Sequence, residues 1–165
     1  MRRLAPRIAL AFAVLAAPAA ADCLPEGGVF SCQIGDKRLE ICHETDIITY
    51  SFGPPGQPEM QITEPMESVD FLPWPGVSNS IWETVTFTND GYGYEVWTSQ
   101  ERTAEEDSPL EAGVRVMQGD TLVAELTCDP GTPSNSLEMI WDLKEAVGMC
   151  WEFSSSSWKT TCDNG

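Results

Sequence analysis

Six cysteines, all downstream of a short N-terminal leader, constrain this chain more than any other feature. They are Cys23, Cys32, Cys42, Cys128, Cys150 and Cys162. An even number of cysteines in a chain that leaves the reducing interior of the cell is typical of a disulfide framework, here of up to three bonds. Zinc sites favour cysteines spaced as C-x2-C, and no such pair occurs in the sequence. We therefore expect a fold that disulfides cross-link.

The leader, residues 1–21, has the parts of a secretory signal peptide. Three arginines form its positive region, an apolar stretch of about ten residues follows at 8–17, and alanines precede the junction. A membrane-spanning helix needs ~20 apolar residues, so this stretch is too short for an anchor. We predict cleavage after Ala21 and a periplasmic or secreted location. The mature part, 22–165, is expected to form a single β-rich domain, with a helix and a disulfide-pinned tail at about 135–165.

The pairing of the six cysteines is only partly constrained. Cys150 and Cys162 lie close together beyond the expected helix, and we predict a bond between them. The other four leave three pairings open. A bond between Cys32 and Cys42 would cross the first hairpin, but the apolar alternation of its two strands places these residues on opposite faces. That register favours other partners for both cysteines.

The only histidine of the chain, His43, follows Cys42 and raises the question of a metal or catalytic site. Adjacent residues of a strand point to opposite faces, so these two side chains are poorly placed to share a metal ion. A nucleophilic cysteine needs a thiolate, which an oxidising compartment disfavours. We predict a structural cluster with His43 on the surface, and no catalytic residue, metal site, cofactor or enzymatic activity.

Alternating apolar residues between turn residues predict eight strands. The expected strands are 29–34, 38–44, 47–53, 59–63, two within the hairpin 80–99, and two within the hairpin 114–128. In the hairpin 80–99 a turn at Asp90-Gly91 sets Val85 opposite Val96 and Phe87 opposite Tyr94. Residues 64–79 are expected to form a long irregular loop.

Helical spacing of apolar residues predicts one helix at 137–147. Asn135 and Glu138 are expected to form a capping box at its start, and Gly148 ends it. The predicted fold class is mainly β: an antiparallel sandwich or barrel of about seven or eight strands with one C-terminal helix, stapled by disulfides.

Acidic residues dominate the charge of the expected mature chain. All 26 Asp and Glu lie after residue 21, and six of the nine Lys and Arg remain with them, which leaves a net charge of about −20. Such a surface repels nucleic acid and anionic membranes and favours a basic protein partner. One predicted function is therefore an interaction or inhibitor-like module whose acidic loop at 101–112 meets a basic protein. A structural envelope protein is a further possibility.

Tryptophans are the other candidate binding residues. Trp82 and Trp97 are expected on the less apolar face of the central hairpin, and Trp74 lies between two prolines. Exposed indole rings can stack on sugars or anchor an interface, which makes binding of a carbohydrate or envelope glycan the alternative function. We favour packing of both strand tryptophans under the helix or against a second sheet. Oligomeric state does not follow from the sequence.

Several stretches resemble a set of small exported proteobacterial β-rich proteins. In these a Tyr-x-Phe-Gly-x-x-Gly-x-Pro-Glu element, here 50–59, precedes two hairpins and a closing cysteine, here Cys128. The resemblance covers about 23–128 and implies a fold but no biochemical role. A weaker likeness is to periplasmic lysozyme inhibitors, which are also small, exported, disulfide-bonded β proteins. It implies an inhibitor role, although their Ser-Gly loop signature does not occur in this sequence.

Overall fold

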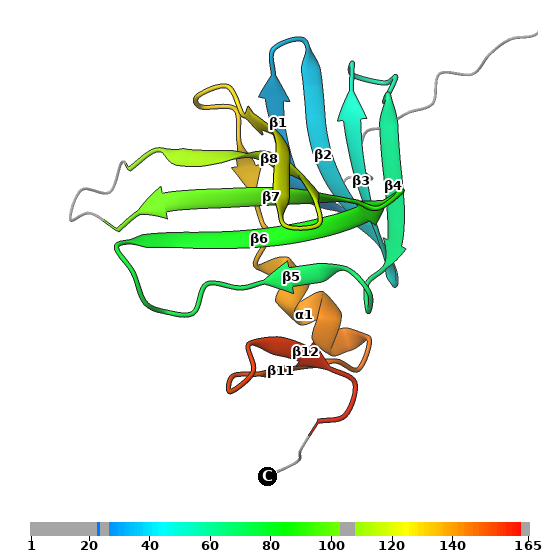
Figure 1. Ribbon diagram of the computed structural model, residues 1–165, viewed down its shortest axis with the longest axis vertical. Coiled ribbons are helices and arrows are strands. Elements are labelled where there is room, and N and C mark those ends of the chain that lie inside the picture. Colours follow the sequence, from blue (N-terminus) through cyan, green and yellow to red (C-terminus); the bar gives the residue numbers. More distant parts are fainter. Residues whose placement is uncertain (1–22, 24–26, 103–107, 163–165) are drawn as a thin grey trace, which may run out of the picture.

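The computed structural model describes residue 23 and residues 27–102 and 108–162. In this part of the chain the protein is mainly β, with three antiparallel sheets, one helix and three disulfides (Figure 1). The predicted fold class is thereby confirmed as a sandwich with one helix. The expected signal peptide lies outside the described residues. None of the described segments forms a helix with the length and apolarity to cross a membrane.

The first sheet has the strand order β10-β1-β2-β3-β4. Its members are β1 (Gly28–Ile34), β2 (Lys37–Glu44), β3 (Ile47–Gly53), β4 (Met60–Pro65) and β10 (Ser134–Asn135). The β1–β2 register pairs Phe30 with Ile41 and Cys32 with Leu39, and all four side chains are buried. A slip of one residue would turn this apolar set outward, so burial of one face fixes the register.

The second sheet has the order β5-β6-β7-β8-β9. Its members are β5 (Asp70–Leu72), β6 (Ser80–Asn89), β7 (Tyr92–Glu101), β8 (Leu110–Gln118) and β9 (Thr121–Thr127). The predicted pairs Val85–Val96 and Phe87–Tyr94 are both present. Asp90 and Gly91 adopt positive φ angles of 50° and 80°, as a two-residue hairpin turn requires.

The two five-stranded sheets face each other, with the strands of one running steeply across those of the other (Figure 1). Side chains from both inner faces fill the space between them. The core takes its largest members from β3, β5 and β6: Tyr50, Phe71 and Phe87, each with at most 1% of its surface exposed. Tyr50 lies 5.6 Å from Phe87 between ring centroids, so it joins the two layers.

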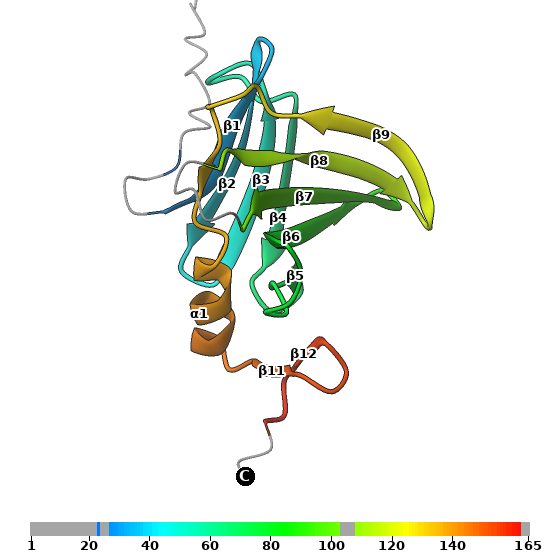
Figure 2. The ribbon, with the colours of Figure 1, turned by 90° about the vertical axis from the view of Figure 1, so that its left-hand side faces the viewer.

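Helix α1 (Met139–Ala146) and a third sheet of β11 (Cys150–Glu152) and β12 (Ser157–Lys159) lie at one end of the sandwich, next to β5 (Figures 1 and 2). The helix begins two residues later than predicted, and the capping box is wrong. Glu138 makes no capping hydrogen bond, whereas Asn135 Oδ1 accepts one from the Leu137 amide at 3.1 Å. Asn135 is held in strand β10, too far before the helix to cap it.

The eight predicted strands correspond to β1–β4 and β6–β9, and four short strands were not predicted. One of these, β5, lies within 64–79, so the prediction of an irregular loop there is wrong in part. Strands β5, β10, β11 and β12 have two or three residues each. A segment of that length contains no measurable alternation, because the period of a strand is itself two residues.

The six cysteines form the bonds Cys23–Cys42, Cys32–Cys128 and Cys150–Cys162. The last is the pair that the sequence favours, and Cys32 and Cys42 bond to other partners, as their register indicates. Cys32 in β1 and Cys128 after β9 link the two large sheets. Three disulfides fit an extracellular or periplasmic protein.

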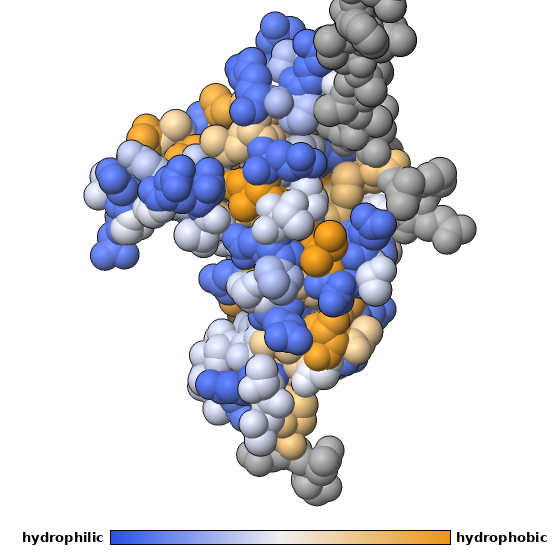
Figure 3. All heavy atoms as spheres, turned by 90° about the vertical axis from the view of Figure 1, so that its right-hand side faces the viewer, coloured by the Kyte–Doolittle hydropathy of each residue, from blue (hydrophilic) through white to orange (hydrophobic). Residues whose placement is uncertain are grey.

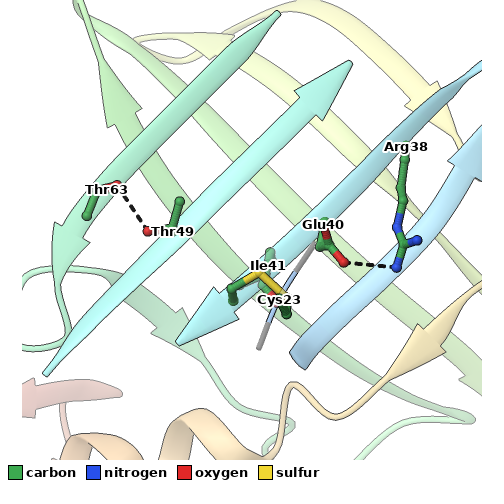
Figure 4. The surroundings of a disulfide bond; sticks show 7 residues. Cys23, Arg38, Glu40, Ile41, Thr49 and Thr63 are labelled. Atoms are coloured by element: carbon green, nitrogen blue, oxygen red, sulfur yellow. Dashed lines mark hydrogen bonds and ion pairs between the residues drawn. A yellow bond between two sulfur atoms is a disulfide. The ribbon is translucent and has the colours of Figure 1, made fainter. Parts of the chain in front are cut away.

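The Cys23–Cys42 bond lies on the face of the first sheet that points away from the second (Figure 4). On the same face Arg38 pairs with Glu40 at 2.9 Å, and the Thr49 and Thr63 hydroxyls share a hydrogen bond of 3.0 Å. Polar side chains therefore line this outer face, in keeping with the alternation of the strands.

Candidate functional site

A cleft of about 620 Å³ opens between the second sheet and the C-terminal hairpin. Ten residues line it, five of them aromatic and none charged: Leu72, Pro73, Trp74, Pro75, Gly76, Trp82, Trp141, Trp151, Phe153 and Ser156. We call this the aromatic cleft. Four of the six tryptophans of the chain meet there.

The β5–β6 segment forms one wall of the cleft. Trp74 is held by its indole N–H, which donates to the Val77 carbonyl at 2.8 Å, and by the Arg102 guanidinium, which lies 5.0 Å from its ring centroid. Trp82 stands in β6 on the face opposite to Val85 and Phe87, because side chains alternate along a strand. It is therefore outside the sandwich core and partly exposed.

The helix and the tail form the other wall. Trp141 of α1 lies 6.2 Å from Trp151 and 5.1 Å from Trp158 between ring centroids, and Trp151 meets Trp158 edge-on at 5.4 Å. Trp158 also donates its indole N–H to the Phe71 carbonyl at 2.8 Å, which fastens the hairpin to β5. Phe153, 79% exposed, stands at the mouth of the cleft. Edge-on and tilted ring contacts of this kind stabilise the cluster beyond the area that it buries.

Lys144 of α1 holds the wall formed by the helix and the tail in place. Its side chain is 1% exposed, and its ammonium donates to the Met66 carbonyl at 2.9 Å while lying 5.4 Å from the Trp158 ring centroid. Burial lowers the pKa of Lys144 to about 8, against the opposing effect of Asp70 and other nearby carboxylates. A buried ammonium needs such partners, so Lys144 fixes where α1 sits relative to the chain that follows β4.

A second hollow of about 310 Å³ adjoins the aromatic cleft and shares Leu72, Trp151 and Ser156 with it. It adds polar side chains, among them Asp70 and Ser157. The combined groove therefore offers flat aromatic faces in one part and hydrogen-bonding groups in the other. Well-formed ligand sites commonly combine these features.

The structure brings together two of the three tryptophans that the sequence singled out. Trp74 and Trp82 line the cleft, whereas Trp97 lies elsewhere on the second sheet. The Trp97 ring packs over Gly113, where an added Cβ would approach the ring to 3.0 Å, and the Arg115 guanidinium lies 5.0 Å from its centroid. The expected cover by the helix or a second sheet does not apply to Trp97, because β8 itself supplies its contacts.

The cleft also contains Trp141, Trp151 and Phe153, which the sequence did not single out as binding residues. The available signal was the disulfide-closed tail, in which Trp151 and Phe153 alternate between Cys150 and Cys162. An aromatic pair in a loop that a disulfide constrains is held at the surface at little cost in conformational entropy. That reasoning favours a binding role for the tail.

The cysteine of the cluster at Cys42 and His43 is bonded to Cys23. Cys23, Glu40 and Cys42 are the one group within the described ranges that has metal-ligand spacing, and its two sulfurs bond to each other. The prediction that His43 lies on the surface holds only in part, because the residue is partly exposed but its polar atoms are not. Its ring nitrogens are inaccessible to solvent, and no described residue hydrogen-bonds to them.

No protein-family model, curated protein or solved structure matches the chain. The resemblances to exported proteobacterial proteins and to lysozyme inhibitors therefore stay predictions.

Proposed function

We propose that the protein is exported by a signal peptide that is cleaved after Ala21, and that it binds a neutral glycan in the aromatic cleft. The observation that supports this proposal is the lining of the cleft, in which four tryptophans and Phe153 surround an uncharged hollow. Soluble proteins seldom leave so much aromatic surface together and open to solvent unless a ligand covers it.

Sugar rings suit this surface because one face of a pyranose carries C–H groups and its rim carries hydroxyls. The C–H face stacks on an indole, and the hydroxyls need hydrogen-bond partners close by. Here Ser156 lies in the cleft, and Asp70 and Ser157 line the adjoining hollow. The strongly acidic chain disfavours an anionic polysaccharide, so the ligand class is a neutral glycan.

The test is calorimetric titration of the mature, oxidised protein with a neutral oligomer of N-acetylglucosamine and with an anionic oligomer of a uronic acid. We expect binding of the neutral oligomer only, little affected by added salt. Trp82→Ala should weaken it at least about tenfold, as truncation of a central aromatic side chain commonly does. Trp97→Ala is the matched control, since Trp97 lies outside the cleft, and it should leave the affinity unchanged. Equal effects of the two substitutions would contradict the proposal.

A basic protein partner is the second candidate, and the net charge of the chain supports it. The prediction of an acidic loop at 101–112 is wrong in part, because Glu101 ends β7 and residues 110–112 belong to β8. Residues 103–107 lie outside the described residues. The two candidates differ in their response to salt. Binding to a basic protein should weaken steeply as salt is added, because surface charges are screened.

A further inference from the structure

The aromatic cleft and the adjoining hollow meet along three shared residues, Leu72, Trp151 and Ser156. The hollow has half the volume of the cleft, about 310 Å³ against about 620 Å³. Their linings also differ, because three charged residues line the hollow and none lines the cleft. A single ligand that fills both therefore needs a flat apolar part and a part rich in hydrogen-bonding groups.

Asp70 supplies an open hydrogen-bond acceptor in the hollow. Side chains alternate along β5, so Asp70 points to the same side as Leu72 and away from the buried Phe71. Asp70 is exposed, and within the described ranges no residue donates a hydrogen bond to its carboxylate. A carboxylate has several acceptor sites on two oxygens, so it can receive hydrogen bonds from neighbouring hydroxyls of one sugar ring.

Lys144 also lines the hollow, but its ammonium is already occupied. It donates to the Met66 carbonyl at 2.9 Å and to the Glu67 carbonyl at 3.4 Å, and it lies 3.7 Å from the Met149 sulfur. These contacts use the three donors of an ammonium, so Lys144 has none left for a ligand. Asp70 is the carboxylate that acts most strongly on this buried charge. The positive charge offsets part of the negative charge of Asp70, so the hollow suits the hydroxyls of a neutral sugar.

Ser156 stands at the junction of the two cavities, in the turn between β11 and β12. Its φ angle is 47°, a left-handed conformation that is unfavourable for a residue with a Cβ and that glycine adopts freely. Its side chain is exposed, and nothing in the part of the chain that the structure describes hydrogen-bonds to its hydroxyl. A strained residue that holds an open hydroxyl between two cavities favours a role in binding.

We propose that one neutral glycan chain spans both cavities. One part of the chain stacks in the aromatic cleft, the next sugar ring places its hydroxyls against Asp70 in the hollow, and Ser156 hydrogen-bonds to the ligand between them. This inference rests on the proposed binding of a neutral glycan in the cleft, and it makes Asp70 and Ser156 the residues that select an oligosaccharide over a single sugar. The face drawn in Figure 3 shows apolar residues only as separate patches among hydrophilic ones, so it offers a long ligand no continuous apolar track.

Calorimetric titration of the mature, oxidised protein with N-acetylglucosamine oligomers of increasing length tests the proposal. We expect the affinity to rise once the oligomer is long enough to enter the hollow, and then to level off. Asp70→Asn should lower the affinity about tenfold for oligomers above that length and leave the affinity of shorter ones unchanged. Glu64→Gln is the matched control, because Glu64 also acts on Lys144 but lines neither cavity. It should bind oligomers of every length as the wild type does.

Ser156→Gly separates a loss of binding from a loss of folding. Glycine relieves the unfavourable φ angle, so the variant should unfold at a urea concentration no lower than the wild type does. It lacks the hydroxyl, so it should bind the longer oligomers about fivefold more weakly. A variant that is at least as stable and yet binds more weakly assigns the hydroxyl to the ligand.

The outcomes distinguish this proposal from the one on which it rests. An affinity that does not depend on oligomer length overturns the spanning chain, and so does Asp70→Asn if it has no effect or weakens all lengths equally. If Trp82→Ala still weakens binding in those cases, the glycan site in the aromatic cleft stands without the hollow. No binding of any oligomer overturns both.

Discussion

Glu83 is a carboxylic acid whose protonation is linked to folding. It stands in β6 on the inner side, in line with Val85 and Phe87, and it is partly buried. Burial raises the pKa of Glu83 to about 7, and the nearby Glu138 adds to the shift while a hydrogen bond from Asn135 opposes it. The folded protein therefore keeps a proton there between about pH 4.5 and 7, whereas the unfolded chain has released it.

The sign of the effect on stability follows from this difference in bound protons. The contribution of Glu83 to the unfolding free energy is greatest below about pH 4.5 and is lost as the pH rises through about 7. Glu83→Gln should remove that loss, so urea unfolding should show the variant as more stable than the wild type at pH 8. Glu111→Gln makes the same change on an exposed residue of β8. Parallel stability curves for wild type and Glu83→Gln would contradict the assignment.

At the scale of the elements, the C-terminal hairpin depends on its own disulfide. The Cys150–Cys162 bond and the contacts of Trp158 hold β11 and β12 against β5. Cys150→Ala with Cys162→Ala should loosen this hairpin without unfolding the large sheets. The near-ultraviolet circular dichroism of the tryptophan cluster should fall, and the far-ultraviolet β signal should persist.

The matched control for that experiment is Cys23→Ala with Cys42→Ala. This bond closes a comparable stretch of chain, with a sequence separation of 19 against 12, and lies on the outer face of the first sheet (Figure 4). It should leave the tryptophan signal intact. If both signals are lost together when the Cys150–Cys162 bond is removed, the hairpin is part of the sandwich core and not an attached element.

The long strands could be predicted because burial of one face constrains each of them. A shift of one residue in the hairpin 80–99 would expose Val85 and Phe87, so the alternation alone identifies the pairs. The aromatic cleft could not be predicted in this way. Trp82 and Trp151 are far apart in sequence. They line the same cleft because α1 docks where the Lys144 ammonium donates a hydrogen bond to the Met66 carbonyl. Such a contact between distant segments leaves no periodic signal in the sequence.

At the scale of the whole molecule, one disulfide bond links the two large sheets. Cys32 lies in β1 and Cys128 follows β9, so this bond joins the first strand of one sheet to the last strand of the other. The two cysteines are 96 residues apart, and both are buried. Closing a loop of this length removes more freedom from the unfolded chain than either of the other two bonds, which span 19 and 12 residues.

Cys32→Ala with Cys128→Ala should therefore be the most destabilising of the three paired substitutions. Restored chain entropy alone lowers the unfolding free energy by about 4 to 5 kcal/mol, against about 3 kcal/mol for the shorter loops. Small domains are stable by only about 5–15 kcal/mol, so this variant should lose a large share of its stability.

Truncation of two buried side chains adds to the loss, and the urea m-value separates the two causes. A freer unfolded chain exposes more surface and raises the m-value, whereas a cavity in the folded state leaves it unchanged. An m-value equal to that of the wild type would assign the loss to packing, and a variant more stable than Cys23→Ala with Cys42→Ala would show that the long-range bond does not hold the two sheets together.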